Sequence, residues 1–99
     1  MARTHRYHPL IADDLASATG YYDDVSLDLG NRFRSSVRQS LKSIQEYPES
    51  YGVIHQQIRA AIMDRFPYVV LFELRENTVF ILSIVHAASD RDGWFDRAI

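Results

Sequence analysis

The fold is decided by one stretch, residues 58–94, which reads IRAAIMDRFPYVVLFELRENTVFILSIVHAASDRDGW. It holds two apolar runs, residues 68–72 and 79–85, on either side of the polar turn Arg75-Glu76-Asn77. Both runs are rich in β-branched and aromatic residues, which favour strands. Because the link between them is short and polar, the simplest prediction is an antiparallel hairpin. A third strand is expected over residues 57–65, which lead into the hairpin.

The first half of the chain predicts one strand and two helices. Residues 4–8 are expected to form a short edge strand, and Pro9 suits the start of a helix. Apolar residues then recur at helical spacing in two groups, which are Leu15, Ala18, Tyr22 and Val25, then Phe33, Val37, Leu41 and Ile44. Gly30 and Asn31 are expected to separate the helices, and Pro48 to end the second.

These elements predict a two-layer α+β fold, in which a short N-terminal strand and a helical hairpin pack on one face of a small, mainly antiparallel sheet. Residues 1–99 are expected to form a single domain, since chains of this length usually do. The absence of cysteine fits a reducing compartment, so a cytoplasmic location is expected. No apolar run is long enough to cross a membrane, and the basic N-terminus lacks the apolar core of a secretory signal.

The charge balance counts against one class of function. The formal net charge is −2, whereas domains that bind nucleic acid mainly by charge are usually strongly basic. Ten of the eleven cationic residues are arginines, and Lys42 is the exception. Arginine suits planar contacts with carboxylates and phosphates.

The strands predict an apolar surface on both faces of the sheet. Residues 69–72 and 79–82 do not alternate between apolar and polar, as a strand covered on one face should. The helices cover one face, so something else should cover part of the other. Two explanations stay open: a partner chain or second copy covers it, or the tail folds back and covers it with Trp94 and Phe95.

Several polar residues are candidates for chemistry, although no phosphate loop, nucleophile elbow or dinucleotide fingerprint occurs. His86, at the end of the last strand, could act as a general acid or base, or could simply hydrogen-bond Asp90 or a backbone carbonyl. Arg59 and Arg65 lie six apart on one expected strand, which would place them on one face, where they could hold a phosphate or acidic side chains. Surface ion pairs with Asp64 or Glu73 are the alternative.

Two further groups of residues are weaker candidates. His5 and His8 lie close together, but without further ligands they are expected to be solvated, and no metal site or cofactor is predicted. The tail alternates acidic and basic residues, which predicts self-paired, solvated side chains. Trp94 stands out within it, because Trp seldom occurs in a polar tail without packing on something.

The order of motifs resembles the RelE/ParE family of bacterial toxins, in the branch called plasmid stabilisation proteins. The family's opening and its Leu-Gly-x-x-Phe motif are matched by Pro9, Ala12, Asp14-Leu15, Tyr21-Tyr22-Asp23, Leu29-Gly30 and Phe33. Its Ile-Arg, Phe-Pro-Tyr and C-terminal motifs are matched by Ile58-Arg59, Phe66-Pro67-Tyr68, His86, Asp90, Trp94 and Arg97. The resemblance covers nearly the whole chain, and the set is fairly specific in this order.

The resemblance implies the toxin of a type II toxin–antitoxin pair, with a cognate antitoxin that covers the sheet face, as a homodimer or a heterotetramer with the antitoxin. Some members of the family cut messenger RNA on the ribosome, and others poison DNA gyrase without doing chemistry. The first alternative would use His86, Arg59, Arg65 and Tyr68 as catalytic residues. The second would use Asp90, Arg91, Trp94 and Arg97 for binding.

The departures from the family pattern favour the gyrase hypothesis. This branch usually has His-x-x-Arg-Asp-Pro before the Trp, but Ser89 stands at the Arg position and Arg91 at the Pro position. The ribonuclease members use a cluster of Lys and Arg, and Tyr68 stands where a catalytic Arg is expected. A ParE-like toxin is therefore predicted, with the endoribonuclease as the alternative and an inactive relative that acts as a binding module as the third hypothesis.

Overall fold

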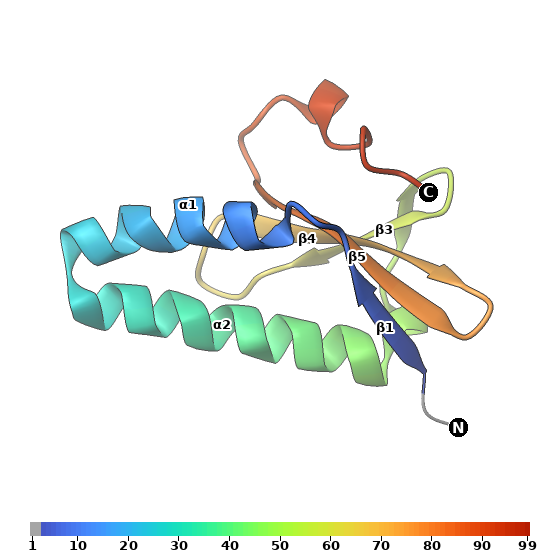
Figure 1. Ribbon diagram of the computed structural model, residues 1–99, viewed down its shortest axis with the longest axis horizontal. Coiled ribbons are helices and arrows are strands. Elements are labelled where there is room, and N and C mark those ends of the chain that lie inside the picture. The colour runs from blue at the N-terminus through green and yellow to red at the C-terminus, as the bar shows by residue number, and fades with distance from the viewer. Residues whose placement is uncertain (1–2) are drawn as a thin grey trace.

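The computed structural model describes residues 3–99 and shows two helices packed on a five-stranded sheet (Figure 1). The strands are β1 (Thr4–Tyr7), β2 (Val53–His55), β3 (Ile58–Ile62), β4 (Tyr68–Arg75) and β5 (Thr78–His86). Their order in the sheet is β1-β5-β4-β3-β2. β1 pairs with β5 in parallel and every other pair is antiparallel, so the predicted α+β class is confirmed.

The β4–β5 hairpin forms the centre of the sheet, as predicted. Its register runs from Tyr68 opposite His86 to Arg75 opposite Thr78, and Glu76 turns the chain with a left-handed φ of 54°. Leu71 pairs with Ser83 and Phe72 with Ile81, so Leu82 is the extra residue of a β-bulge. The bulge changes which backbone groups of β5 point toward the edge of the sheet.

The helices are α1 (Ile11–Val25) and α2 (Leu27–Glu46), and the break between them differs from the prediction. It falls at Ser26, whose side-chain Oγ accepts a hydrogen bond from the Leu29 N–H at 3.1 Å and so caps α2. The prediction of a break at Gly30 and Asn31 is wrong, because both lie inside α2. A Cβ atom at Gly30 would collide with the carboxylate of Asp23, so a larger residue there would have to displace this side chain, which is paired with Arg34.

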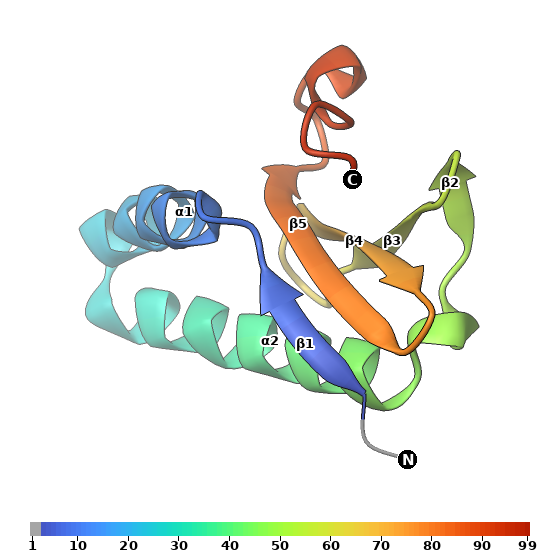
Figure 2. The ribbon, with the colours of Figure 1, turned by 45° about the vertical axis from the view of Figure 1, so that its right-hand side comes forward.

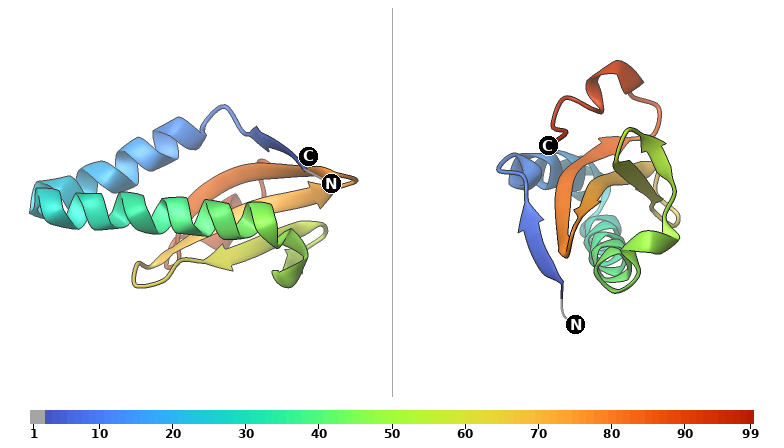
Figure 3. Two further views of the ribbon diagram at one scale, coloured as in Figure 1. Left: turned by 90° about the horizontal axis from the view of Figure 1, so that it is seen from below. Right: turned by 90° about the vertical axis from the view of Figure 1, so that its right-hand side faces the viewer.

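The main core lies between the helices and the sheet. From α2 it takes Phe33, Val37 and Ile44, as the helical spacing predicted, and these residues are at most 4% exposed. Tyr22 of α1 packs on the Phe33 ring with 4.9 Å between centroids. The helical hairpin extends past the end of the sheet (Figure 3, left).

A second apolar cluster covers the face of the sheet away from the helices. It contains Ile58, Val69, Leu71, Leu82 and Trp94, and Trp94 is only 5% exposed. Figure 2 shows the C-terminal segment, in red, over this face. Of the two explanations for the apolar face, the folded-back tail is the one that the structure shows, so this face does not by itself require a partner.

Two elements were not predicted in their observed form. β2 was missed because its three residues are all exposed, so the sequence there shows no alternation of apolar and polar residues. It is fixed partly by tertiary contact, because the His55 ring stacks on Phe95 with 4.1 Å between centroids. Near the end of α2, a single 3₁₀ turn (Pro48–Ser50) follows instead of a plain loop. Within residues 3–99, neither helix combines the length and the apolar character that a membrane span demands.

Candidate functional site

Tyr68 and His86 meet at the end of the β4–β5 hairpin that lies opposite its turn. They are direct partners in the register, and their rings lie edge to face with 5.1 Å between centroids. The backbone N–H of Ala88 donates to His86 Nδ1 at 3.0 Å, so a neutral imidazole carries its proton on Nε2. His86 is exposed. Two of the four predicted catalytic residues are therefore brought together.

Tyr68 is held beneath this exposed imidazole by aromatic neighbours. Its ring lies 5.3 Å from that of Phe33 and 6.2 Å from that of Tyr22. Burial, with a smaller contribution from Tyr21, raises the pKa of the Tyr68 phenol above its ordinary value of 10.0. The phenol therefore stays protonated at neutral pH, and can donate a hydrogen bond rather than act as a base.

Arg59 and Arg65 do not lie on one strand, so this part of the prediction is wrong. β3 ends at Ile62, and Arg65 lies in the following loop with a left-handed φ of 70°. The period of two that related the two residues therefore does not reach Arg65. Arg59 instead donates from Nη1 to the main-chain oxygen of Tyr51 at 2.6 Å, and the Arg65 side chain is 86% exposed.

Ser89 links the end of β5 to the buried Trp94. Its Oγ donates to the main-chain oxygen of His86 at 2.6 Å and accepts from Trp94 Nε1 at 2.8 Å. Ser89 stands where the family pattern has Arg, and here a small hydroxyl fits between the strand end and the indole. Arg91 lies over the Trp94 ring, with Cζ 5.1 Å from the centroid.

Asp90 has a local role in the described structure. Its Oδ1 accepts from the Asp92 N–H at 3.0 Å, which caps the 3₁₀ turn formed by Arg91–Gly93. The hydrogen bond between His86 and Asp90, one of the alternatives that the sequence left open, does not form among the described residues, and His86 Nδ1 accepts from the Ala88 N–H instead. Three of the four residues predicted to bind a target therefore already contact other parts of the chain, and these are Asp90, Arg91 and Trp94.

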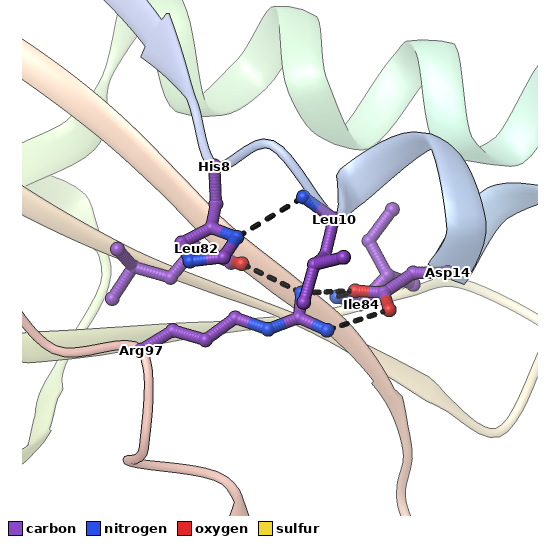
Figure 4. A network of polar contacts seen from close by, with 6 residues as sticks. All are labelled: His8, Leu10, Asp14, Leu82, Ile84 and Arg97. Carbon is purple, nitrogen blue, oxygen red and sulfur yellow. Dashed lines mark hydrogen bonds and ion pairs between the residues drawn. The ribbon is translucent and has the colours of Figure 1, made fainter.

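Arg97 makes the most extensive polar contacts of the C-terminal segment (Figure 4). Its Nη1 and Nη2 lie 2.7 Å and 3.0 Å from the two carboxylate oxygens of Asp14 in α1. Nη1 also donates to the Leu82 oxygen at 3.0 Å, and Asp14 Oδ2 accepts from the Ile84 N–H at 3.0 Å. The side chains of Arg97 and Asp14 are 22% and 15% exposed.

The reason for this network is the length of β1. β1 pairs with β5 only as far as Ile81, so the Leu82 oxygen and the Ile84 N–H have no strand beside them. Arg97 and Asp14 satisfy them instead, as buried backbone groups require. In the sequence Asp14 stood out only as part of a family motif, and this role was missed because its partners lie 70 and 83 residues away.

Glu73 and Arg75 of β4 hold the last residue described. Glu73 is only 1% exposed; its Oε1 accepts from Arg75 Nε at 2.9 Å and its Oε2 from the Ile99 N–H at 2.8 Å. Arg75 Nη2 donates to the Ile99 oxygen at 2.8 Å. Of the surface ion pairs offered as the alternative for Arg59 and Arg65, the one between Arg65 and Asp64 is present at 3.9 Å. The one with Glu73 is not, because this carboxylate is buried under the tail.

Residues 3–99 contain no group of three His, Cys, Asp or Glu side chains that could hold a metal ion. The Nδ1 atom of His8 accepts a hydrogen bond from the Leu10 N–H at 3.1 Å, at the start of α1. The Tyr68–His86 pair itself places an imidazole beside a protonated phenol.

Three comparisons with known proteins agree with this geometry. Residues 6–91 match the family model described as the ParE toxin of the type II toxin–antitoxin system parDE. Toxin ParE2 of Mycobacterium tuberculosis is 28% identical over 87 residues, which span 87% of this chain and 83% of that protein. A structure of the chromosomal ParDE toxin–antitoxin system from P. aeruginosa matches in fold with a TM-score of 0.73 at 16% identity, over 86% of this chain and 96% of that one. The chain belongs to the ParE toxin family of type II toxin–antitoxin systems.

Proposed function

We propose that this toxin arrests growth by binding DNA gyrase in the cytoplasm, without cutting nucleic acid itself, and that a cognate antitoxin neutralises it. The observation that carries the proposal is that His86 has no cationic residue among its contacts within residues 3–99. The interactions of His86 there are with Tyr68, Ala88 and Ser89, none of which is cationic.

Cleavage of a phosphodiester builds negative charge on the phosphate oxygens, and cationic groups fixed nearby stabilise it. Losing one such donor typically lowers the rate by about 10²–10³. In this chain Arg59 is engaged by the Tyr51 backbone, Arg65 lies in another loop, and Arg91 lies over Trp94. The arginines that a nuclease would need are thus directed elsewhere.

Messenger RNA cleavage remains the second candidate, because one observation favours it. The Tyr68 phenol is kept protonated beside the exposed His86, and a proton donor next to an imidazole is a usable acid–base pair. This pair could act only if the ribosome or the RNA supplied the missing charge stabilisation.

The deciding experiment combines a gyrase assay with a messenger RNA assay on the same variants. Purified toxin should inhibit DNA supercoiling by gyrase, and His86→Ala should inhibit as well as the parent. His5→Ala, an exposed histidine of β1, is the matched control. New cuts in cellular messenger RNA that disappear in His86→Ala but persist in His5→Ala would overturn the gyrase proposal. Absence of growth arrest on induction would support the inactive relative.

The antitoxin part of the proposal has its own test. If a small reading frame lies next to the toxin gene, its co-expression should restore growth and its product should co-purify with the toxin. Light scattering on the purified complex then distinguishes a heterotetramer from a one-to-one complex. Continued arrest in its presence would contradict the proposed neutralisation.

A further inference from the structure

The tip of the helical hairpin, formed by residues 21–28, carries an apolar patch that neither core covers. Tyr21, Val25 and Leu27 are 65%, 64% and 68% exposed, and none of them belongs to either apolar cluster of residues 3–99. Tyr21 and Val25 lie one turn apart on α1, so their side chains are neighbours, and Leu27 follows at the start of α2. Single exposed apolar residues are ordinary, whereas a contiguous group of them marks an interaction site.

The tip projects from the molecule, and its parts are held in place. Figure 3 (left) shows the helical hairpin extending past the end of the sheet. Arg34 of α2 joins the two helices there, because its Nη1 donates to Asp23 Oδ1 at 3.0 Å. The Tyr21 ring lies edge to face against the buried Tyr22, with 5.2 Å between centroids. A side chain that is already held loses less conformational freedom on binding, so the projecting tip suits a concave surface of a partner.

The patch has a carboxylate at its edge that nothing in the described chain neutralises. Asp24 lies three residues from Tyr21 on α1 and is exposed, and its side chain makes no ion pair or hydrogen bond within residues 3–99. The other carboxylates of the tip, Asp23 and Asp28, are each paired with an arginine of α2. The tip therefore carries a net negative charge beside exposed apolar side chains. This combination complements an apolar pocket with a lysine or arginine at its rim.

The residues first predicted to bind the target contact other parts of the chain, so the tip offers a free surface that they do not. We propose that the hairpin tip contacts DNA gyrase, by entering a concave surface of gyrase that has an apolar floor and a basic rim. Tyr21 is the central anchor, because tyrosine is among the residues that most often dominate binding energy. Val25 and Leu27 exclude water around it, and Asp24 faces the basic rim. The inference rests on the proposed function, because it names the surface by which the toxin acts on gyrase.

Matched pairs of variants test the inference in a supercoiling assay with purified gyrase and the full-length toxin. Tyr21→Ala should raise the toxin concentration for half-inhibition about tenfold or more, whereas Tyr47→Ala, at a tyrosine 63% exposed just beyond α2, should raise it less than about twofold. Asp24→Arg should raise it about fivefold or more, and Asp13→Arg, with the same charge change in the first turn of α1, less than about twofold. Circular dichroism and thermal melting of each free variant check the fold.

Photo-crosslinking supplies an independent readout. A photoreactive amino acid in place of Leu27 should crosslink the toxin to gyrase, and one in place of Ile62, which is 81% exposed on β3, should not. If the toxin inhibits gyrase but Tyr21→Ala and Asp24→Arg act like their controls and no crosslink forms at Leu27, this surface is wrong and the proposed function stands. If the parent toxin does not inhibit gyrase, the proposed function fails and the inference fails with it. If light scattering shows a toxin dimer that Tyr21→Ala converts to a monomer with inhibition unchanged, a second copy occupies the tip and the inference is overturned.

Discussion

The Asp14–Arg97 ion pair is expected to hold the C-terminal segment against α1 and β5, and Arg97→Met should destabilise the fold markedly. The substitution removes two ion-pair contacts and the bond to the Leu82 oxygen, and leaves the Asp14 carboxylate with the Ile84 N–H. Removing one partner of a buried pair costs about 3–5 kcal/mol. Because these side chains are 22% and 15% exposed, we expect about 2–3 kcal/mol of unfolding free energy.

For a chain of this size that loss corresponds to a fall of roughly 10–20 °C in Tm. Urea denaturation measures it directly, and Trp94, the single tryptophan, reports the packing of the C-terminal segment by fluorescence. A double-mutant cycle with Asp14→Ala should give a coupling energy of about 1.5–2 kcal/mol.

The matched control is an ion pair of similar length on the surface. Arg32 and Asp28 lie 3.0 Å apart in α2, but their side chains are 70% and 75% exposed. Arg32→Met should therefore cost less than about 0.5 kcal/mol. If Arg97→Met costs no more than Arg32→Met, or if the coupling energy with Asp14 is near zero, the pair does not anchor the segment.

Three other substitutions or conditions follow from the same structure. Trp94→Ala should lower the unfolding free energy by about 3–5 kcal/mol in urea denaturation, because it empties the second core; a loss near zero would mean that the tail does not cover the sheet. Gly20→Ala should stabilise α1 by about 0.5–1 kcal/mol in thermal melts, since nothing lies within 4 Å. Gly30→Ala should stabilise less or destabilise, because its Cβ would displace the Asp23 carboxylate from Arg34; equal stabilisation by both variants would refute this reasoning. The raised pKa of Tyr68 means that stability is fully present below about pH 10 and falls as pH rises above it; denaturation at pH 9 to 11 should show this fall, and Tyr68→Phe should reduce it.

The sequence predicted the hairpin and the helices because their signals are local. β-Branched and aromatic runs around Arg75-Glu76-Asn77 specify two strands and a turn, and the spacing of Phe33, Val37 and Ile44 specifies the buried face of α2. The predicted helix break was misplaced because glycine occurs in helices for two reasons: it can end a helix, or it can fit where a side chain would clash. Gly30 was interpreted as a helix breaker, whereas it leaves room for the Asp23 carboxylate of α1, which only the packing reveals.

The residues of the candidate site were likewise predicted where the signal is local and missed where it depends on distant partners. The motif order identified His86 and Tyr68, and pairing of the two strands then brings them together. Arg59 and Arg65 were grouped by a period that holds only within one strand, and the chain leaves β3 before Arg65. Asp14 and Glu73 gave no signal of their roles, because their partners are distant in sequence.

The sequence by itself thus determined the two helices and the central hairpin of this toxin, its α+β class and its family, because periodicity, turn chemistry and motif order are properties of neighbouring residues. The tertiary structure alone decided what covers the second face of the sheet. The stretch from residue 58 to Trp94 is apolar on both sides, and a partner or the tail could have covered it. The tail does so, because Trp94 packs on β4 and β5 while Arg97 and Asp14 satisfy the backbone groups that the short β1 leaves open.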